Sequence, residues 1–232
     1  MAAVALVGLP APPASAMAGG RPLDWQTQAG GMVSLRIGPH TCSGALISLR
    51  PQDRNSRLVL TAQHCIAGYG LDQIQVFNGG NTIDQGTRYS VGAAQLLRVN
   101  GQTDTDSVLL QLTERANGSL PFPFDANGNY FNGTRVRLDG YGANDNTGWN
   151  YNLRQGDFTI TLQTVTHAFF VGDGAVPCTG DSGGPFINQD GVVIGTQDTG
   201  PVDCDVRWAN ANGMSYSKLQ DTDIENWVRQ LG

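Results

Sequence analysis

Hydrophobic positions along the chain fall into short runs, several of which alternate with polar residues and lie between turn-rich stretches. Runs of this length and spacing are typical of β-strands. The pattern predicts strands at 32–37, 42–48, 57–61, 74–77, 89–99, 107–112, 135–138, 158–165, 185–188 and 191–196. Two β-barrels would close the edges of so many strands. We therefore expect an all-β protein.

The last stretch of the chain has a different period. Apolar residues recur there at helical spacing of three to four, at Leu219, Ile224, Trp227, Val228 and Leu231. Ser217 or Asp221 could cap such a helix. We expect a C-terminal helix over about 219–231 that packs on the second barrel.

Composition supports a folded β-protein and excludes some functions. The 31 glycines and 11 prolines divide the sequence into short pieces, and 40% of the residues are hydrophobic. The net charge of −6 is spread without any run of like charge. The sequence therefore carries neither a nucleic-acid footprint nor a polybasic membrane anchor.

The N-terminal residues resemble an export signal. An apolar run at 2–9 precedes the small residues Ala14-Ser15-Ala16, which form an A-x-A cleavage pattern. We expect residues 1–16 to be a signal peptide, the mature chain to begin at Met17, and the protein to be secreted. No apolar stretch is long enough to span a bilayer. In an exported protein the four cysteines favour disulfides over metal ligands, but their number leaves three pairings open.

The stretch with most chemical content is Cys178-Thr179-Gly180-Asp181-Ser182-Gly183-Gly184-Pro185. Glycines around one serine let the backbone turn tightly, so that its N–H groups can converge on a ligand. Donors of this kind stabilise the oxyanion that forms when an acyl carbonyl is attacked. Ser182 is therefore a candidate nucleophile.

A serine nucleophile needs a base, and a carboxylate to orient that base. Of the three histidines, His64 follows an apolar strand and precedes Cys65. Asp106 stands at the start of another apolar strand, and Asp104 is its rival for the carboxylate role. We expect His167 to lie in a loop and His40 either to support the site or to be structural.

Three segments now resemble the signature segments of the trypsin/chymotrypsin family of serine peptidases, in the same order. They are Thr61-Ala62-Gln63-His64-Cys65, Asp106-Ser107-Val108-Leu109-Leu110 and Gly180-Asp181-Ser182-Gly183-Gly184-Pro185. Further similarity in His40-Thr41-Cys42-Ser43-Gly44 and around Trp227 extends the resemblance over about residues 17–231. The chain is similar to a secreted, bacterial-type member.

The resemblance implies two packed six-stranded antiparallel β-barrels, at about 17–120 and 121–218, followed by the helix. It implies a catalytic triad of His64, Asp106 and Ser182, with an oxyanion hole made by the N–H groups of Gly180 and Ser182. The carboxylate of Asp181 would pair with the new amino terminus at Met17.

The family pattern also implies disulfides Cys42–Cys65 and Cys178–Cys204, and no metal or cofactor. Val176 would occupy the floor of the substrate pocket beside Pro177, with Gly200 and Gly213 in the walls. A valine floor favours an uncharged, apolar residue on the acyl side of the cut bond. The expected partners are polypeptide substrates and protein protease inhibitors, and the expected state is a monomer.

Three other readings compete with an endopeptidase. Gly180-x-Ser182-x-Gly184 fits the nucleophile elbow of α/β-hydrolases, but in that fold the histidine follows the serine, and no histidine follows His167. An esterase could use the same acyl-enzyme chemistry. A catalytically idle binding protein could keep the fold.

Overall fold

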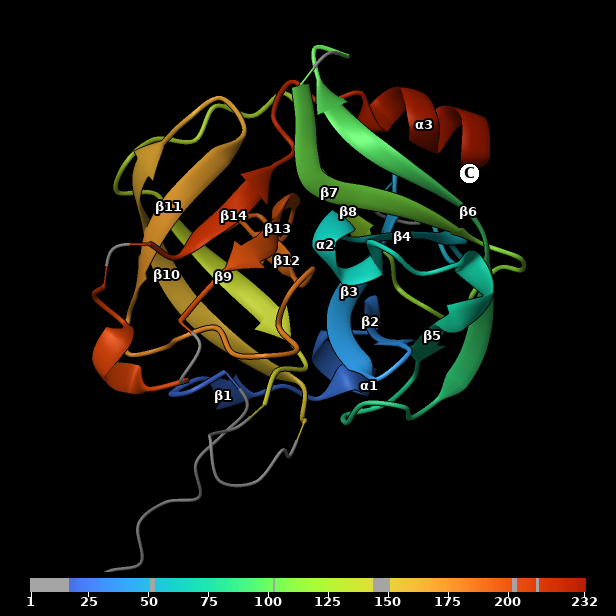
Figure 1. Ribbon diagram of the computed structural model, residues 1–232, viewed down its shortest axis with the longest axis horizontal. Helices are drawn as coiled ribbons and strands as arrows, with labels where there is room; N and C mark the ends of the chain where they lie inside the picture. The colour runs from blue at the N-terminus through green and yellow to red at the C-terminus, as the bar shows by residue number, and fades with distance from the viewer. Residues whose placement is uncertain (1–16, 51–52, 102, 144–150, 202–203, 212) are drawn as a thin grey trace, which may run out of the picture.

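The computed structural model describes residues 17–50, 53–101, 103–143, 151–201, 204–211 and 213–232. The chain forms two β-barrels side by side, and α3 (Ile224–Leu231) lies across β6 and β7 of the first (Figure 1). No helix in these ranges has both the length and the apolar character of a membrane span.

The first barrel contains six antiparallel strands. In spatial order they are β2 (Met32–Ile37), β5 (Ile74–Asn78), β6 (Thr87–Val99), β7 (Thr103–Leu112), β4 (Leu58–Ala62) and β3 (His40–Ser48). Pairing of β2 with β3 closes the barrel, and the short β8 (Phe122–Pro123) adds to β3 in parallel. Closure leaves the six strands without a free edge.

The second barrel repeats this arrangement. Its order is β10 (Arg154–Gln163), β11 (His167–Gly172), β14 (Ser215–Lys218), β13 (Val193–Thr199), β12 (Pro185–Ile187) and β9 (Arg135–Gly140), closed by β9 and β10. The two-residue β1 (Arg21–Pro22) extends β10. The expected fold of two six-stranded antiparallel barrels is confirmed, although residues 17–22 lie against the second barrel rather than the first.

Short helical segments connect the strands. They are α1 (Trp25–Gln28), α2 (Gln63–Ile66) and the 3₁₀ turns η1 (Leu71–Gln73) and η2 (Val206–Trp208). The aromatic rings of Phe158, Phe170, Phe186 and Tyr216 pack together in the core of the second barrel, where Phe186 and Tyr216 stack with centroids 4.5 Å apart.

The C-terminal helix differs from the expectation in extent and in location. It begins at Ile224, because residues 219–223 are not helical and Asp221 among them has a φ of 60°. Its buried residues Ile224 and Val228 join a cluster with Leu58 and Leu109 of the first barrel. The expectation that it packs on the second barrel was wrong, since the chain crosses back after β14 to cover this apolar surface.

Candidate active site

His64 and Asp106 form a direct pair at the junction of the two barrels. His64 is the second residue of α2, which follows β4 directly, and Asp106 lies on the neighbouring β7. The His64 Nδ1 atom is 2.6 Å from Oδ2 of Asp106, and the His64 backbone N–H donates to Oδ1 at 2.8 Å. The hydrogen bond to Asp106 raises the pKa of His64 above its ordinary value, although burial opposes this shift.

The second barrel helps to hold Asp106. Its backbone N–H donates to the hydroxyl of Ser217 at 3.2 Å, and the neighbouring Ser107 shares a buried hydrogen bond of 2.7 Å with Thr196. The rival carboxylate, Asp104, is exposed and pairs with Arg98 at 2.8 Å. The structure thus brings Asp106 to His64 and turns Asp104 to the surface.

Ser182 lies beside the strand that leads to His64. Its carbonyl accepts the N–H of Ser43 at 2.8 Å and faces the sulfur of Cys65 at 3.8 Å. Gly183 follows with a φ of 79°, and a Cβ there would come within 2.7 Å of the Ala62 nitrogen, so only glycine permits this approach. Among the described contacts, none is a hydrogen bond between the Ser182 hydroxyl and His64. Such bonds often tighten only when substrate binds.

The serine loop leaves two backbone donors available. The N–H groups of Asp181, Gly183 and Gly184 make hydrogen bonds within the second barrel, whereas those of Gly180 and Ser182 have no acceptor among the described residues. The Ser43 hydroxyl fixes the loop by donating to the Gly180 carbonyl at 2.7 Å. This role of Ser43 was not predicted from the sequence, because nothing in the residues next to it indicates a contact with the Gly180 loop.

Asp181 is fully buried. Its carboxylate accepts the N–H groups of Cys178 and Gly142, each at 2.8 Å, and burial raises its pKa to about 7 despite these bonds. Nearby, Ala18 bridges Val176, so the chain just after Met17 runs beside the segment that leads to Asp181. The expected cleavage site at Ala16 lies outside the described residues.

A cavity of about 280 Å³ opens beside Ser182. It is lined by Pro177, Cys178, Thr179, Ser182, Gln197, Asp198, Thr199, Gly200 and Pro201. Of the four expected pocket residues, Pro177 and Gly200 line this cavity. Val176 is buried in the core of the second barrel, and Gly213 is exposed with its carbonyl bonded to Thr199. The walls are also more polar than a valine floor implied.

One of the two expected disulfides is present. Cys42 and Cys65 are bonded, which ties β3 to the helix that carries His64. Cys178 and Cys204 are both buried, but no disulfide joins them. The structure therefore differs from the expectation of a second disulfide. The Cys178 sulfur lies 3.7 Å from the Val176 carbonyl oxygen, and the neighbouring Cys204 side chain together with burial raises the pKa of the Cys178 thiol.

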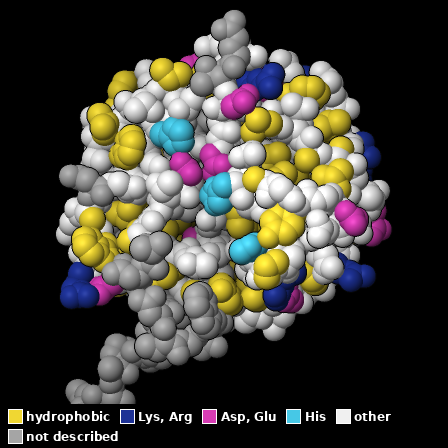
Figure 2. Space-filling model, viewed as in Figure 1, with side chains coloured by type: hydrophobic (Ala, Val, Ile, Leu, Met, Phe, Trp, Pro, Cys, Tyr) yellow, Lys and Arg dark blue, Asp and Glu magenta, His cyan; other side chains and the backbone are white. Residues whose placement is uncertain are grey.

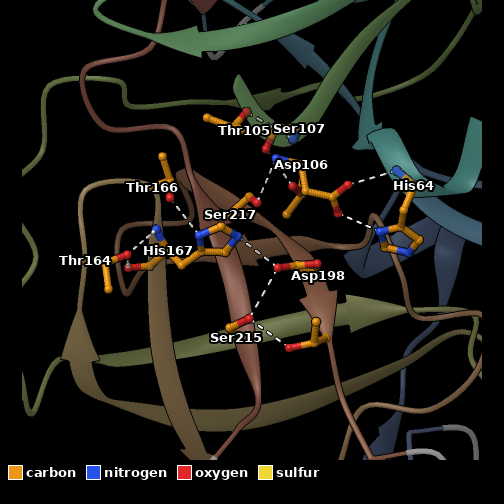
Figure 3. Close-up of polar contacts among 12 residues, drawn as sticks. His64, Thr105, Asp106, Ser107, Thr164, Thr166, His167, Asp198, Ser215 and Ser217 are labelled. Carbon is orange, nitrogen blue, oxygen red and sulfur yellow. Dashed lines mark hydrogen bonds and ion pairs between the residues drawn. The ribbon is translucent and has the colours of Figure 1, made fainter. Parts of the chain in front are cut away.

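A second histidine–aspartate pair adjoins the first. His167 begins β11 rather than lying in a loop, and its Nε2 atom is 3.0 Å from Oδ2 of Asp198 on β13 (Figure 3). Sequence analysis did not foresee this pair. His40 packs edge-on against Tyr69, with ring centroids 6.0 Å apart.

Histidine and acidic side chains consequently gather near the centre of one face (Figure 2). His64, Asp106 and Asp198 each place one potential metal-ligand atom within 4.8 Å of the others. Hydrogen bonds to His64 and His167 already occupy both carboxylates, so we interpret the group as a polar network.

The comparisons with known proteins agree with this geometry. A family model described as Trypsin matches residues 20–208. Pig (Sus scrofa) trypsin is 31% identical over 67% of this chain and 72% of its own length, and rat (Rattus norvegicus) cationic trypsin-3 is 28% identical over 67% and 68%. These relatives are animal proteins, so the expected bacterial type has no support.

Solved structures with the same fold include proteins described as inactivated. A scabies mite inactivated protease paralogue matches with a TM-score of 0.69 at 15% identity, over 87% of this chain and 91% of its own. Human heparin binding protein matches with a TM-score of 0.70 at 20% identity, over 91% and 95%. These likenesses show the fold alone. The family model, the relation to pig trypsin and the two barrels together show that this chain belongs to the trypsin family.

Proposed function

We propose that the chain is a secreted serine endopeptidase in which His64, Asp106 and Ser182 form the catalytic triad. The observation that carries this proposal is the 2.6 Å contact between His64 and Asp106 beside the Ser182 loop. A carboxylate on Nδ1 holds the imidazole so that its other nitrogen can act as a base. The Cys42–Cys65 disulfide and the predicted export signal support secretion.

In this mechanism Ser182 Oγ attacks the substrate carbonyl while its proton passes to His64 Nε2. The N–H groups of Gly180 and Ser182 stabilise the oxyanion, and Asp106 stabilises the imidazolium. His64 then gives the proton to the leaving amine, so the peptide bond breaks and an acyl-enzyme remains. Water, deprotonated by His64, attacks the ester carbonyl; the bond to Ser182 Oγ breaks, His64 returns the proton to Oγ, and the carboxylic acid product leaves.

The cavity beside Ser182 would receive the side chain on the acyl side of the cut bond. The carboxylate that it includes, Asp198, is engaged by His167 at 3.0 Å. A guanidinium or ammonium group buried there would lack a free partner, which costs several kcal/mol. We therefore propose a preference for uncharged, apolar residues at this position of the substrate. Thr179 and Thr199, which line the cavity, limit the size of the side chain that it accepts.

The strongest competing function is a binding protein without activity. The scabies mite paralogue, whose description calls it inactivated, shares the fold. This chain has histidine, aspartate and serine at all three triad positions, which favours activity. An esterase on the same fold would use the same acyl-enzyme chemistry.

Labelling with a sulfonyl fluoride tests the mechanism. We expect one adduct, mapped to Ser182 by mass spectrometry, and loss of hydrolysis in proportion to labelling. Ser182→Ala should lose both the adduct and activity on casein. A protein that cleaves a small ester but not casein would be an esterase, and one that neither labels nor cleaves would be the binding homologue.

A further inference from the structure

Two carboxylates lie between two imidazole rings at the junction of the barrels (Figure 3). On one side His64 contacts Asp106 at 2.6 Å, and on the other His167 contacts Asp198 at 3.0 Å. Oxygens of Asp106 and Asp198 and a ring nitrogen of His64 all lie within 4.8 Å of one another. Both carboxylates are mostly buried, with 15% of each side chain exposed.

Hydrogen bonds with two neutral hydroxyl groups fix the outer pair. The His167 Nδ1 atom is 2.7 Å from the Thr166 hydroxyl, which leaves Nε2 directed at Asp198. The Ser215 hydroxyl donates to the same Asp198 oxygen at 3.3 Å. Asp198 is therefore held in place from two strands of the second barrel, β11 and β14.

Two adjacent buried carboxylates repel each other unless a cation or a proton compensates. Here each carboxylate has its own imidazole. Burial alone would raise the pKa of Asp198, but the hydrogen bond and charge of His167 lower it overall, and the pKa of His167 is raised in turn by its hydrogen bond to Asp198. The outer pair thus holds an ionised carboxylate close to the triad.

Resting on the proposed function, we propose that Asp198 and His167 are positioning residues that control the charge around the His64–Asp106 pair during catalysis. With His167 protonated, its charge offsets that of Asp198, and the network carries one net negative charge when His64 is neutral. That is the charge of an isolated triad. The imidazolium that forms on His64 during attack by Ser182 then meets two carboxylates rather than one.

The charged groups that face this network come from four elements. They are His64 on α2, Asp106 on β7, His167 on β11 and Asp198 on β13. The adjoining β14 contributes the neutral hydroxyls of Ser215 and Ser217, while its Lys218 points its ammonium at the Thr164 carbonyl. The described neighbours therefore leave His167 as the cation that offsets Asp198.

The proposal predicts opposite effects of two substitutions on His64. Asp198→Asn removes a negative charge, so the pKa of His64 should fall, and the acid limb of kcat/KM should move down by about one pH unit. His167→Gln keeps a donor near Nε2 but removes the positive charge, so the limb should move up by about half a unit. The double variant should return close to the wild-type midpoint, because it removes both charges.

Two readouts separate this proposal from the proposed function. One is the pH profile of kcat/KM for the four proteins, with Asp104→Asn as a control because that surface carboxylate pairs with Arg98. The other is a ¹⁵N-histidine NMR titration in a Ser182→Ala background, which needs no activity. If Asp198→Asn does not fold, Asp198→Ser removes the same charge.

The NMR result expected is that the pKa of His64 shifts in opposite directions in the two single variants and returns to the wild-type value in the double variant. That result would support the network even if the protein cleaves no peptide, and the proposed function alone would then fail. Midpoints within about 0.2 pH units of wild type in both single variants would overturn the proposal. So would shifts in the same direction, which indicate a structural role only.

Discussion

The backbone N–H of Ser43 on β3 donates a 2.8 Å hydrogen bond to the carbonyl of Ser182, so the first barrel holds the Ser182 loop of the second. The Ser43 hydroxyl continues this link by donating to the Gly180 carbonyl at 2.7 Å and accepting the Tyr141 N–H at 2.8 Å. One buried serine therefore joins the two barrels beside Ser182.

Ser43→Ala should weaken both stability and activity. It leaves a buried carbonyl and a buried N–H without partners, which costs about 1–3 kcal/mol of unfolding free energy. Freeing the Gly180 peptide should lower kcat/KM about 10-fold to 100-fold. Denaturant unfolding and peptide hydrolysis measure the two effects.

Ser119→Ala is the matched control, since the hydroxyl of that buried serine makes a single hydrogen bond, to the Ala116 carbonyl at 2.8 Å. It should lose stability without losing kcat/KM. Wild-type kcat/KM in folded Ser43→Ala would show that the link to Gly180 has no catalytic role.

The mature enzyme should begin at Met17 and depend on Asp181. The buried carboxylate has only backbone donors in the described chain, and an ammonium group at Met17 would supply a counter-charge. Asp181→Asn would remove one partner of that buried pair, which should lower the unfolding free energy by about 3–5 kcal/mol. The same variant should have a strongly reduced kcat/KM.

N-terminal sequencing of the secreted active form and kinetics of the variant check this. Asp190→Asn, in the exposed turn before β13, should behave as wild type. An active form that starts well downstream of Met17 would refute the pairing.

Gly200→Val should narrow the substrate cavity. A Cβ at Gly200 would lie 3.3 Å from the carbonyl oxygen and 3.4 Å from the Cβ of Pro177, which also lines the cavity. We expect kcat/KM for peptides with leucine or phenylalanine before the cut bond to fall about 10-fold or more, and for alanine much less.

Matched peptides that differ only at this residue provide the measurement. Gly92→Val on β6 is the control, because a Cβ there meets only ordinary contacts. A wild-type preference of tenfold or more for arginine or lysine would contradict the uncharged pocket.

Asp139→Asn should stabilise the protein in neutral solution but not in acid. Asp139 is fully buried, its oxygens have no hydrogen-bond donor among the described residues, and Arg137 lies 3.5 Å away. Burial raises its pKa to about 6, although Arg137 opposes this. In the unfolded chain the pKa of an aspartate is about 3.9. The folded protein therefore binds more protons than the unfolded chain between pH 4 and 6, and its unfolding free energy falls as the pH rises through that range.

The asparagine variant lacks this dependence. The difference in unfolding free energy between the variant and wild type should grow by at most about 3 kcal/mol from pH 4 to 6 and then stay level. Unfolding free energies at pH 4, 5, 6 and 7 measure it, with Asp104→Asn as an exposed control. A constant difference over the whole range would mean that Asp139 does not titrate in this window.

The sequence by itself predicted most of the strands and the candidate reacting groups, but it missed β11 (His167–Gly172) and β14 (Ser215–Lys218). Alternation of apolar residues is a local property, so β2 (Met32–Ile37) was predicted at its observed bounds. His64, Asp106 and Ser182 were identified from short motifs because each motif supplies its own turn, strand start or glycine loop. The fold followed from the order of these motifs, through the resemblance to a family.

Only the tertiary structure decided what meets across the barrels. Ser43 reaches the Ser182 loop over more than a hundred residues of chain, and His167 reaches Asp198 because β11 and β13 both pair with β14. The same long-range packing placed α3 on the first barrel and left Val176 outside the cavity. Side-chain patterns along one strand carry no record of which distant strand lies opposite, because that choice depends on how both barrels close.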